Sequence, residues 1–289
     1  MKKITQIFAE KPWTFSFEFF PPKTEAGQAR LLDTAAELAR RGADFFSVTY
    51  GAGGSASHTT LDIVLGLQYR HDVAVMHHLT CVKHTYREIR EQLAGMARVG
   101  VRNIMALRGD LPIDQPDFKL GEDQPKFAYE LIDLLREYRD WFAIGVPGFP
   151  EGHPMAPSLE LDSKYLRIKQ DRGADFTVTQ LFFENEQYFD FVSRVRAEGV
   201  TMRLIPGILP ITNYSRLLDF CSNCGVSVPE RIRDEFEPLR DDPEATREHG
   251  IKFVAEQCRD LLDRGAPGLH FYCLNKPEPV LTICNELGI

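Results

Sequence analysis

Short segments rich in β-branched and aromatic residues alternate with longer amphipathic segments, and this rhythm constrains the fold more than any other feature of the chain. Such alternation is typical of parallel βα units. We predict eight strands, at residues 14–19, 44–49, 74–79, 103–107, 142–146, 175–180, 203–206 and 268–273. The predicted helices include residues 26–41, 85–99, 160–171, 186–198 and 242–264, and the inserted segment 225–241 is expected to form a further short helix.

Several predicted helices end in the same way, at a basic residue followed by glycine just before the next strand. The glycines are Gly42, Gly100, Gly173 and Gly265. Glycine suits the left-handed backbone position after a helix, and a nearby arginine interacts favourably with the helix dipole. Eight strands in this rhythm, without a low-complexity linker in 289 residues, favour a single (β/α)8 TIM barrel over two domains. We therefore treat residues 1–289 as one catalytic domain of the α/β class.

The composition excludes several classes of protein. The chain is 43% hydrophobic and 26% charged, with a net charge of −8, whereas nucleic-acid-binding proteins usually carry a basic face. No segment approaches the roughly 20 apolar residues of a membrane helix, and the N-terminus lacks the apolar run of a signal peptide. Six cysteines are too few for a disulfide scaffold. We expect a cytoplasmic protein with reduced thiols that binds neither nucleic acid nor membranes.

Polar residues stand at the C-terminal ends of most predicted strands, where barrel enzymes build their active sites. The residues are Glu18, Thr49, Tyr50, His77, His78, Arg108, Gly109, Asp110, His153, Gln180, Asn275 and Lys276. Their convergence on one rim predicts an active site there.

Glu18 is the most informative of these residues. Strand alternation places it on one face of the first strand with Thr14 and Ser16, while three phenylalanines occupy the other face. The phenylalanines should pack against helices, so Glu18 should point into the barrel mouth. Desolvation there would raise its pKa, as a general acid requires. The alternative is a structural carboxylate paired with a barrel Arg or Lys.

The other motifs are weaker. Asp110 lies in a tight loop after a strand, and this position suits either a ligand contact or a loop cap, of which the cap is the commoner. Adjacent His77 and His78 point to opposite faces of a strand, so only one can face the site, and the chain has no HxH or HExxH spacing. We predict no metal site.

Two further patterns are not expected to form cofactor sites. GAGGSA (51–56) resembles a dinucleotide-binding turn, but the next predicted strand does not end in the acidic residue that such a site needs. Cys221 and Cys224 form a single CxxC, which cannot supply a four-ligand zinc site. We expect these two thiols to pack in the protein interior.

Seven sequence blocks, in order along nearly the whole chain, resemble the methylenetetrahydrofolate reductases. They are FEFFPPKT (17–24), FFSVTYGAGGS (45–55), HHLTC (77–81), ALRGDLP (106–112), TQLFF (179–183), IPGILPITN (205–213) and FYCLNK (271–276). Each block alone is weak, and together they are specific.

The resemblance implies a barrel that binds FAD non-covalently and reduces 5,10-methylenetetrahydrofolate to 5-methyltetrahydrofolate, which supplies methyl groups for methionine synthesis. NADH or NADPH passes a hydride to the flavin and leaves before the folate binds, in a ping-pong sequence. Glu18 matches the family's general acid, which opens the folate ring to an iminium. Asp110 matches an aspartate near the flavin and pterin, where a negative charge would stabilise that cation.

The resemblance also implies the binding residues. Gln180 matches a pterin contact, Phe220 a residue lining the shared folate and nicotinamide pocket, and Lys276 a contact to a folate carboxylate. The implied FAD contacts are Thr49, His78, Arg108, Gly109, Asp110, His153, Asp162 and Lys169. Lys169 would neutralise phosphate charge.

The sequence departs from the family pattern in a few places. Lys276 stands where some bacterial relatives have arginine, so its contact would be less bidentate. Tyr165 and Ile168 replace polar residues near the FAD phosphate segment, and we assign them no binding role. The regulatory C-terminal domain of animal relatives is not expected, nor is inhibition by S-adenosylmethionine.

Two other functions stay open at this stage. One is a different flavin barrel dehydrogenase, such as an enzyme that oxidises proline, and the other is a non-catalytic folate- or flavin-binding subunit. We expect a homo-oligomer, but the sequence indicates neither its size nor a preference for NADH over NADPH.

Overall fold

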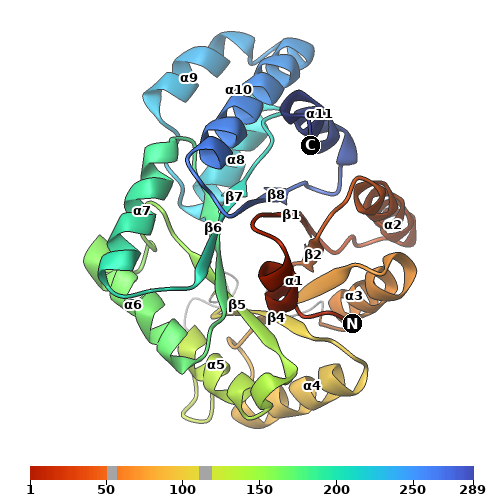
Figure 1. Cartoon of the computed structure of the whole chain (residues 1–289), viewed down its shortest axis with the longest axis vertical. Coiled ribbons are helices and arrows are strands. Elements are labelled where there is room, and N and C mark those ends of the chain that lie inside the picture. The colour runs from red at the N-terminus through yellow and green to blue at the C-terminus, as the bar shows by residue number, and fades with distance from the viewer. Residues whose placement is uncertain (51–56, 111–118) are drawn as a thin grey trace.

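Eight parallel strands close into one barrel in the computed structural model, which describes residues 1–50, 57–110 and 119–289 (Figure 1). The strands follow chain order around the barrel, and β8 pairs with β1. They are β1 (Thr14–Phe19), β2 (Phe45–Val48), β3 (Ala74–Thr80), β4 (Asn103–Leu107), β5 (Ala143–Gly148), β6 (Phe176–Leu181), β7 (Arg203–Ile208) and β8 (Gly268–Tyr272). The predicted TIM barrel is confirmed, and each predicted strand is present with ends shifted by at most two residues.

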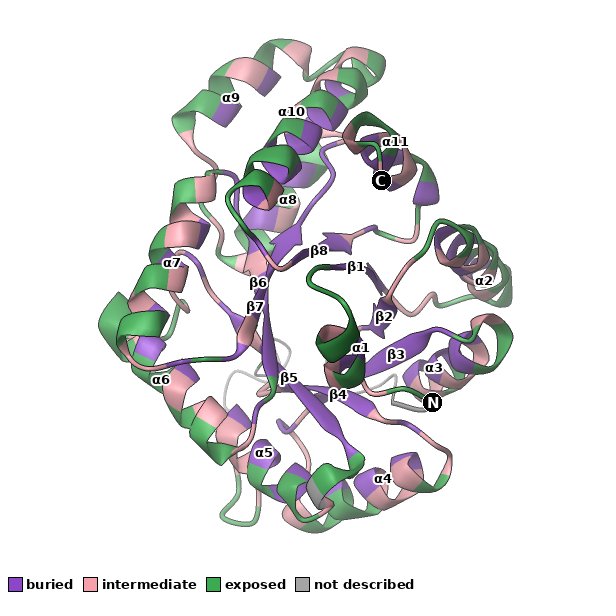
Figure 2. Cartoon of the chain, in the orientation of Figure 1, coloured by how far each residue is buried: buried purple, intermediate pink, exposed green. Residues whose placement is uncertain are grey.

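Helices form a ring outside the barrel and cover its outer face (Figures 1 and 2). They are α2 (Glu25–Arg40), α3 (Ser57–His71), α4 (Tyr86–Arg98), α5 (Ala128–Arg136), α6 (Leu159–Arg172), α7 (Asn185–Ala197), α8 (Tyr214–Cys224), α10 (Pro243–Asp263) and α11 (Pro277–Leu287). The short helix predicted within residues 225–241 is α9 (Glu230–Phe236), which runs into the 3-10 turn η3 (Glu237–Leu239). A second 3-10 turn, η2 (Arg139–Trp141), precedes β5.

The glycines that follow four of these helices have the left-handed backbone that their positions predict. The φ angles are 98° at Gly42, 84° at Gly100, 117° at Gly173 and 87° at Gly265. A residue with a Cβ pays a steric cost in this region, so glycine ends each helix and turns the chain towards the next strand.

A short N-terminal helix, α1 (Ile4–Glu10), closes one end of the barrel and was not predicted (Figure 1). Its Ile4 and Ile7 are buried against inward-facing strand residues such as Met76. The backbone N–H of Ile4 donates to Oδ1 of Asn103 at 2.7 Å. Because α1 lies at the N-terminal ends of the strands, the reactive groups must be reached from the opposite rim.

The two faces of β1 separate as the alternation predicts. Phe15, Phe17 and Phe19 belong to the main hydrophobic core between barrel and helices. Ser16 and Glu18 point inward, where they contact side chains from other strands. Burial is continuous along β1 because both of its faces are covered (Figure 2).

The thiols and helices of the described residues add two findings. All six cysteines are free, and Cys221 is buried near the end of α8, where burial raises its pKa to about 12. No helix in the described ranges combines the length and the apolar character needed to cross a membrane.

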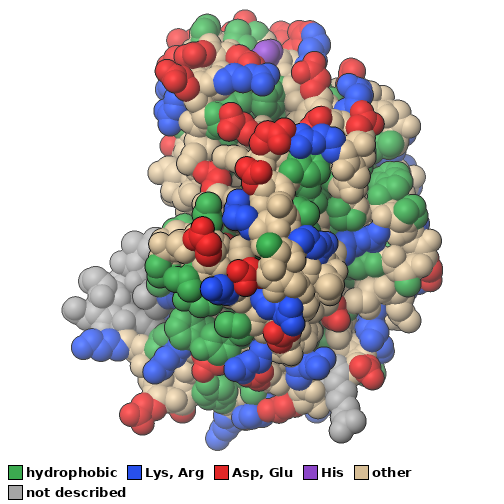
Figure 3. Space-filling model, turned by 60° about the vertical axis from the view of Figure 1, so that its left-hand side comes forward, with side chains coloured by type: hydrophobic (Ala, Val, Ile, Leu, Met, Phe, Trp, Pro, Cys, Tyr) green, Lys and Arg blue, Asp and Glu red, His purple; other side chains and the backbone are tan. Residues whose placement is uncertain are grey.

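The charged side chains on one face of the molecule can be followed in Figure 3. On that face, acidic and basic side chains are interspersed rather than gathered by sign.

Candidate active site

Glu18 lies at the centre of a polar cluster inside the barrel, at the C-terminal end of β1. Its carboxylate accepts a hydrogen bond from the Ser47 hydroxyl of β2 at 3.2 Å. The same oxygen, Oε2, lies 3.4 Å from Nε2 of His78 on β3 and 3.5 Å from Nε2 of His270 on β8. Only 7% of Glu18 is exposed, so its proton exchange depends on these neighbours. They are histidines and a serine, not the Arg or Lys of the structural alternative.

The predicted rise in the pKa of Glu18 is wrong. Burial alone raises the pKa, as expected, but the positive charge of His78, the hydrogen bond and charge of His270, and the Ser47 hydrogen bond together hold it below its usual value. Alternation correctly predicted that Glu18 is buried at the mouth. It could not supply the partners, since they come from three other strands.

His270 is the main member of the cluster that sequence reasoning missed. It is fully buried, and Nδ1 of its ring lies 2.8 Å from the Ser16 hydroxyl. The signal was available in the segment GLHFY, where His270 and Tyr272 alternate with apolar residues. That alternation gives the two polar rings the inward face of β8.

His77 and His78 separate as their adjacency predicts. His78 faces the barrel interior and Glu18, whereas His77 is fully buried on the other face of β3, near the ring of Tyr50. Burial, with a smaller effect from the charge of His78, lowers the pKa of His77 to about 3. Among the described residues, no group of three or more His, Cys, Asp or Glu is arranged to hold a metal ion.

Tyr272 is held across the barrel interior by β6 and β7. Its hydroxyl donates to the carbonyl oxygen of Thr179 at 2.6 Å. Gly207 makes this approach possible, because a Cβ there would lie 2.2 Å from that carbonyl oxygen and 2.7 Å from the tyrosine hydroxyl. Burial, with a smaller effect from Glu18, raises the pKa of Tyr272 well above its usual value. The side chain is therefore a neutral donor.

A second polar cluster joins the ends of β4 and β5 to α6. His153, in the loop after β5, is close enough to Lys169, Arg108 and Asp110 for their charges to act on it. Burial lowers the pKa of His153, and the charges of Lys169 and Arg108 lower it further, whereas the charge of Asp110 raises it. Four implied FAD contacts thus lie near one another although they are far apart in sequence.

Asp162 and Lys169 form the α6 side of this second cluster. Burial raises the pKa of Asp162, against the charge of Lys169, and burial lowers the pKa of Lys169, against the charge of Asp162. Each group therefore stabilises the charged form of the other in a partly buried place. Tyr165 and Ile168, to which no role was assigned, are exposed on the same helix.

The charge of Asp110 acts beyond the second cluster as well as within it. Its charge acts on His153 in the second cluster and, together with that of Glu18, on the Cys224 thiol at the end of α8. Burial and then these two carboxylates raise the pKa of Cys224. A cysteine that was expected only to pack is thus half-buried near both implied catalytic carboxylates.

Backbone groups make up part of the rim. Gly109 has a φ of 84°, and a Cβ added there would lie 2.9 Å from Cβ of Thr80, so the loop needs glycine. The N–H of Thr49 continues the β1–β2 ladder by donating to the Phe19 carbonyl at 3.0 Å. The GAGGSA block that follows lies outside the described residues.

The remaining implied substrate residues are more dispersed. Gln180 ends β6 half-buried, and Phe220 on α8 is half-buried against the hydrophobic core. Lys276 is exposed at the start of α11. Its neighbour Asn275 is structural, since its side chain pairs with both the N–H and the carbonyl of Phe20, at 3.0 and 2.7 Å.

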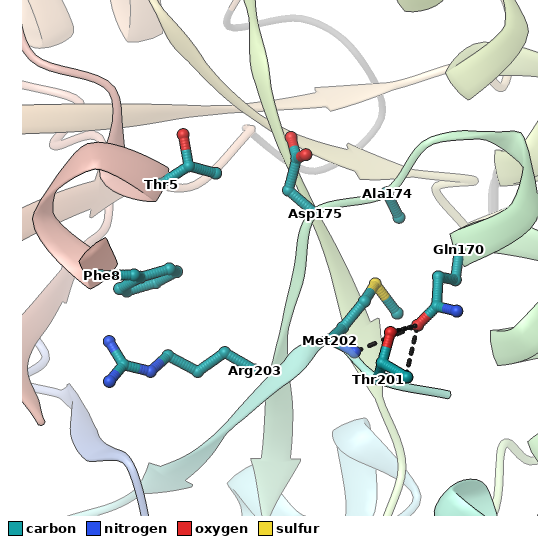
Figure 4. A pocket seen from close by; sticks show the side chains of 8 residues that line it. All are labelled: Thr5, Phe8, Gln170, Ala174, Asp175, Thr201, Met202 and Arg203. Carbon is teal, nitrogen blue, oxygen red and sulfur yellow. Dashed lines mark hydrogen bonds between the residues drawn. The ribbon is translucent and has the colours of Figure 1, made fainter. Parts of the chain in front are cut away.

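A cavity of about 500 Å³ lies at the other end of the barrel (Figure 4). It is lined by Phe8 of α1 and by Asp175, Met202 and Arg203, which stand at the N-terminal ends of β6 and β7. Active sites of TIM barrels lie at the C-terminal ends of the strands. We therefore assign the chemistry to the Glu18 rim.

Comparisons with known proteins agree with the sequence blocks. The family model described as methylenetetrahydrofolate reductase matches residues 3–288. Methylenetetrahydrofolate reductase 1 of Schizosaccharomyces pombe is 37% identical over 293 residues, covering 99% of this chain and 48% of its own length. The 5,10-methylenetetrahydrofolate reductase of Escherichia coli is 36% identical over 275 residues, covering 95% of this chain and 90% of its own length. The chain therefore spans about half the length of the first of these relatives.

Solved structures agree on the fold. An uncharacterised protein from Clostridium thermocellum that binds two copies of 5-methyl-5,6,7,8-tetrahydrofolic acid superposes with a TM-score of 0.61 at 13% identity, covering 98% of each chain. At that identity the likeness concerns the barrel alone.

Proposed function

The chain belongs to the methylenetetrahydrofolate reductase family, and we propose that it reduces 5,10-methylenetetrahydrofolate to 5-methyltetrahydrofolate with NAD(P)H as reductant. The observation that carries the proposal is the buried Glu18 carboxylate at the barrel mouth, within 3.5 Å of two imidazoles. A folate whose ring must open at nitrogen needs one proton at that point, and this cluster is built to hold one. The enzyme would act in the cytoplasm and feed methionine synthesis.

The second cluster fits a phosphate-bearing cofactor. Arginine and lysine bind phosphate through charge-assisted hydrogen bonds. The second cluster contains one residue of each type, Arg108 and Lys169, in an otherwise acidic protein. Gly109 lacks a side chain and lets the backbone approach a ligand closely. We assign non-covalent FAD binding to Thr49, His78, Arg108, Gly109, Asp110, His153, Asp162 and Lys169. When bound, FAD would store the hydride between the two substrates.

Each implied substrate residue has a separate task in this proposal. Glu18 gives a proton to N10 of the folate, and the bond between N10 and the methylene carbon breaks. Asp110 stabilises the cationic iminium that remains at N5, because a fixed negative charge beside it favours the cation over the neutral ring. Gln180 binds the pterin, Phe220 packs on whichever substrate occupies the shared pocket, and Lys276 pairs with a folate carboxylate.

An anaerobic absorbance titration tests the function. The purified protein, loaded with FAD, should lose its flavin absorbance on addition of NADH or NADPH and regain it on addition of methylenetetrahydrofolate. Comparing the two nicotinamides in the first step also measures which one the enzyme prefers.

The outcomes separate the alternative functions. Loss of absorbance without its return points to another flavin barrel dehydrogenase. Binding of flavin or folate without either change points to a non-catalytic subunit. Failure to bind FAD overturns the cofactor assignment. Size-exclusion chromatography of the same preparation tests the expected homo-oligomer.

A further inference from the structure

The imidazole of His270 lies deeper in the barrel than Glu18 and is fully closed to solvent. Its ring stacks on Phe45, with centroids 5.9 Å apart and an interplanar angle of 22°, and meets the Tyr272 ring edge-on at 5.8 Å. Both ring nitrogens nevertheless face polar atoms. A buried imidazole with partners on both sides is arranged to hold a proton.

The hydrogen bonds of the Ser47 hydroxyl place a proton on Nε2 of His270. A serine hydroxyl has one hydrogen to donate. The hydrogen of Ser47 goes to Oε2 of Glu18 at 3.2 Å, so the Ser47 oxygen presents a lone pair to Nε2 of His270 at 3.3 Å. Nε2 is therefore the donor of that contact, and its hydrogen also faces the Glu18 carboxylate at 3.5 Å.

Ser16 provides a partner for either protonation state of the ring. Its oxygen lies 2.8 Å from Nδ1 of His270 and 3.3 Å from the carbonyl oxygen of Leu269. When Nδ1 carries no hydrogen, Ser16 donates to it. When Nδ1 carries a hydrogen, Ser16 accepts from Nδ1 and donates to the Leu269 carbonyl. His270 can thus take up or release a proton without leaving a buried polar atom unpaired.

The groups that face His270 favour proton exchange with Glu18. His78 on β3 lies against the same oxygen of Glu18, and burial lowers the pKa of His78, against the charge of Glu18 and with a smaller effect from a charge on His270. Tyr272 is a neutral phenol, because burial raises its pKa well above the usual value, and the Cys224 thiol nearby has a raised pKa as well. Among the described residues, Glu18 is the carboxylate placed against His270.

We propose that His270 is the proton store of Glu18, a positioning residue that holds on Nε2 the proton that Glu18 delivers to the folate. The inference rests on the proposed function. Glu18 gives its proton to N10, which keeps the electron pair of the broken N10–methylene bond. This is the proton that Nε2 of His270 passes to Oε2 of the ionised Glu18, while Nδ1 keeps its hydrogen, which Ser16 accepts. One proton from water restores the pair in each turnover.

The proposal predicts the direction in which a substitution moves the pH profile. A proton that several sites share is bound more tightly than a proton held by any one of these sites alone. Removing one site therefore lowers the pH at which the proton dissociates. In His270→Gln, the pH at which the folate half-reaction has lost half its rate should be lower than in the unmodified protein by at least about one unit. The rate should recover in more acidic buffer. The NAD(P)H half-reaction should keep its rate and pH profile.

His77→Gln is the matched control, because it changes the adjacent face of β3 and leaves the Glu18 cluster intact. It should not move either profile. A His270→Gln profile that keeps its midpoint, or moves to higher pH, in a folded and flavin-loaded protein would overturn the proposal.

A second measurement needs no turnover and no folate. Histidine-selective 15N NMR of the protein follows the His270 ring through pH, with its signal identified among the eight histidines by contacts to the Phe45 ring. Replacing Glu18 by Gln removes the negative charge that retains the proton, so the ring should lose it at a pH lower by about one unit or more. An unchanged titration would refute the shared proton. If the unmodified protein does not reduce the folate, the proposed function fails, and this spectrum still decides the proton sharing.

Discussion

The imidazole of His78 lies 3.4 Å from the carboxylate of Glu18, and each residue is only 7% exposed. An arginine or lysine in that place would keep Glu18 ionised at all working pH values. Burial lowers the pKa of the His78 imidazole, against the charge of Glu18, so this side chain can give up its charge where an arginine or lysine would keep it. The choice of histidine is what allows a carboxylate with a lowered pKa to serve as an acid.

Replacing Glu18 by Gln should separate the two half-reactions. An amide keeps the volume of the side chain but has no proton to give, and a positioned general acid contributes typically 10²–10⁴-fold to a rate. Methylenetetrahydrofolate reduction should fall by about that factor, while NAD(P)H oxidation should stay within about twofold. Anaerobic stopped-flow absorbance measures each half-reaction separately.

Folding and flavin content of the Glu18→Gln protein serve as its controls. Equal loss of both half-reactions, in a protein with normal flavin content and melting temperature, would count against the role of Glu18 as an acid.

Sequence reasoning located Glu18 for a simple physical reason. Side chains alternate along a strand, and the phenylalanines of β1 identify the covered outer face. The same rule applied to β8 would have found His270. The direction of the Glu18 pKa shift was not accessible in this way, because it depends on charges from β3 and β8 that only closure of the barrel brings within 3.5 Å.

Helix α1 and the second cluster show what local patterns leave out. A helix of seven residues has too few turns for a periodic signal, and α1 is held by contacts to residues such as Asn103, almost a hundred positions away. His153 and Lys169 come together through the fold of the β5–α6 connection. Only the family resemblance pointed to that pair.

Lys169→Met should weaken FAD binding about ten- to a hundredfold. A hydrogen bond to a charged group contributes about 1.5–3 kcal/mol, and about 1.4 kcal/mol corresponds to a factor of ten. Lys169 is half-buried beside Asp162, so its loss also removes the stronger of the two positive charges, Lys169 and Arg194, that act on that carboxylate. Fluorescence titration of the apoprotein with FAD measures the change.

Lys164→Met is the matched control for Lys169→Met, since Lys164 is exposed on the same helix. FAD affinity there should stay unchanged. Equal affinities for the two variants would show that α6 does not contact the cofactor phosphates through Lys169.

Gly207→Ala should destabilise the barrel and displace Tyr272. The new Cβ would meet the Thr179 carbonyl oxygen at 2.2 Å, and overpacking of this kind costs about 1–3 kcal/mol or more. Gly95→Ala, inside α4 with nothing within 4 Å of the added Cβ, should instead stabilise by about 0.5–1 kcal/mol. Urea unfolding of both variants measures whether each substitution lowers or raises the free energy of unfolding. A neutral Gly207→Ala would mean that Tyr272 can move without loss.

The stability of the protein should fall in acid, in part because of His77. Its pKa is about 3 in the folded protein, against an ordinary value of 6.5, and both ring nitrogens are buried without a hydrogen-bond partner among the described residues. The unfolded chain therefore binds a proton that the folded chain refuses between these two pH values. This contribution to stability is complete above pH 6.5 and is lost as the pH falls towards 3, at up to about 1.4 kcal/mol per pH unit.

His77→Gln isolates that contribution, because an amide does not titrate in this range. Urea midpoints measured from pH 7 down to about pH 4.5 should fall less steeply for the variant than for the unmodified protein, and the two curves should differ most at the acid end. Parallel curves would mean that His77 gains a proton in the folded state at an ordinary pH. In that case water or a neighbouring carbonyl must reach the ring, and the outer face of β3 is more open than its burial indicates.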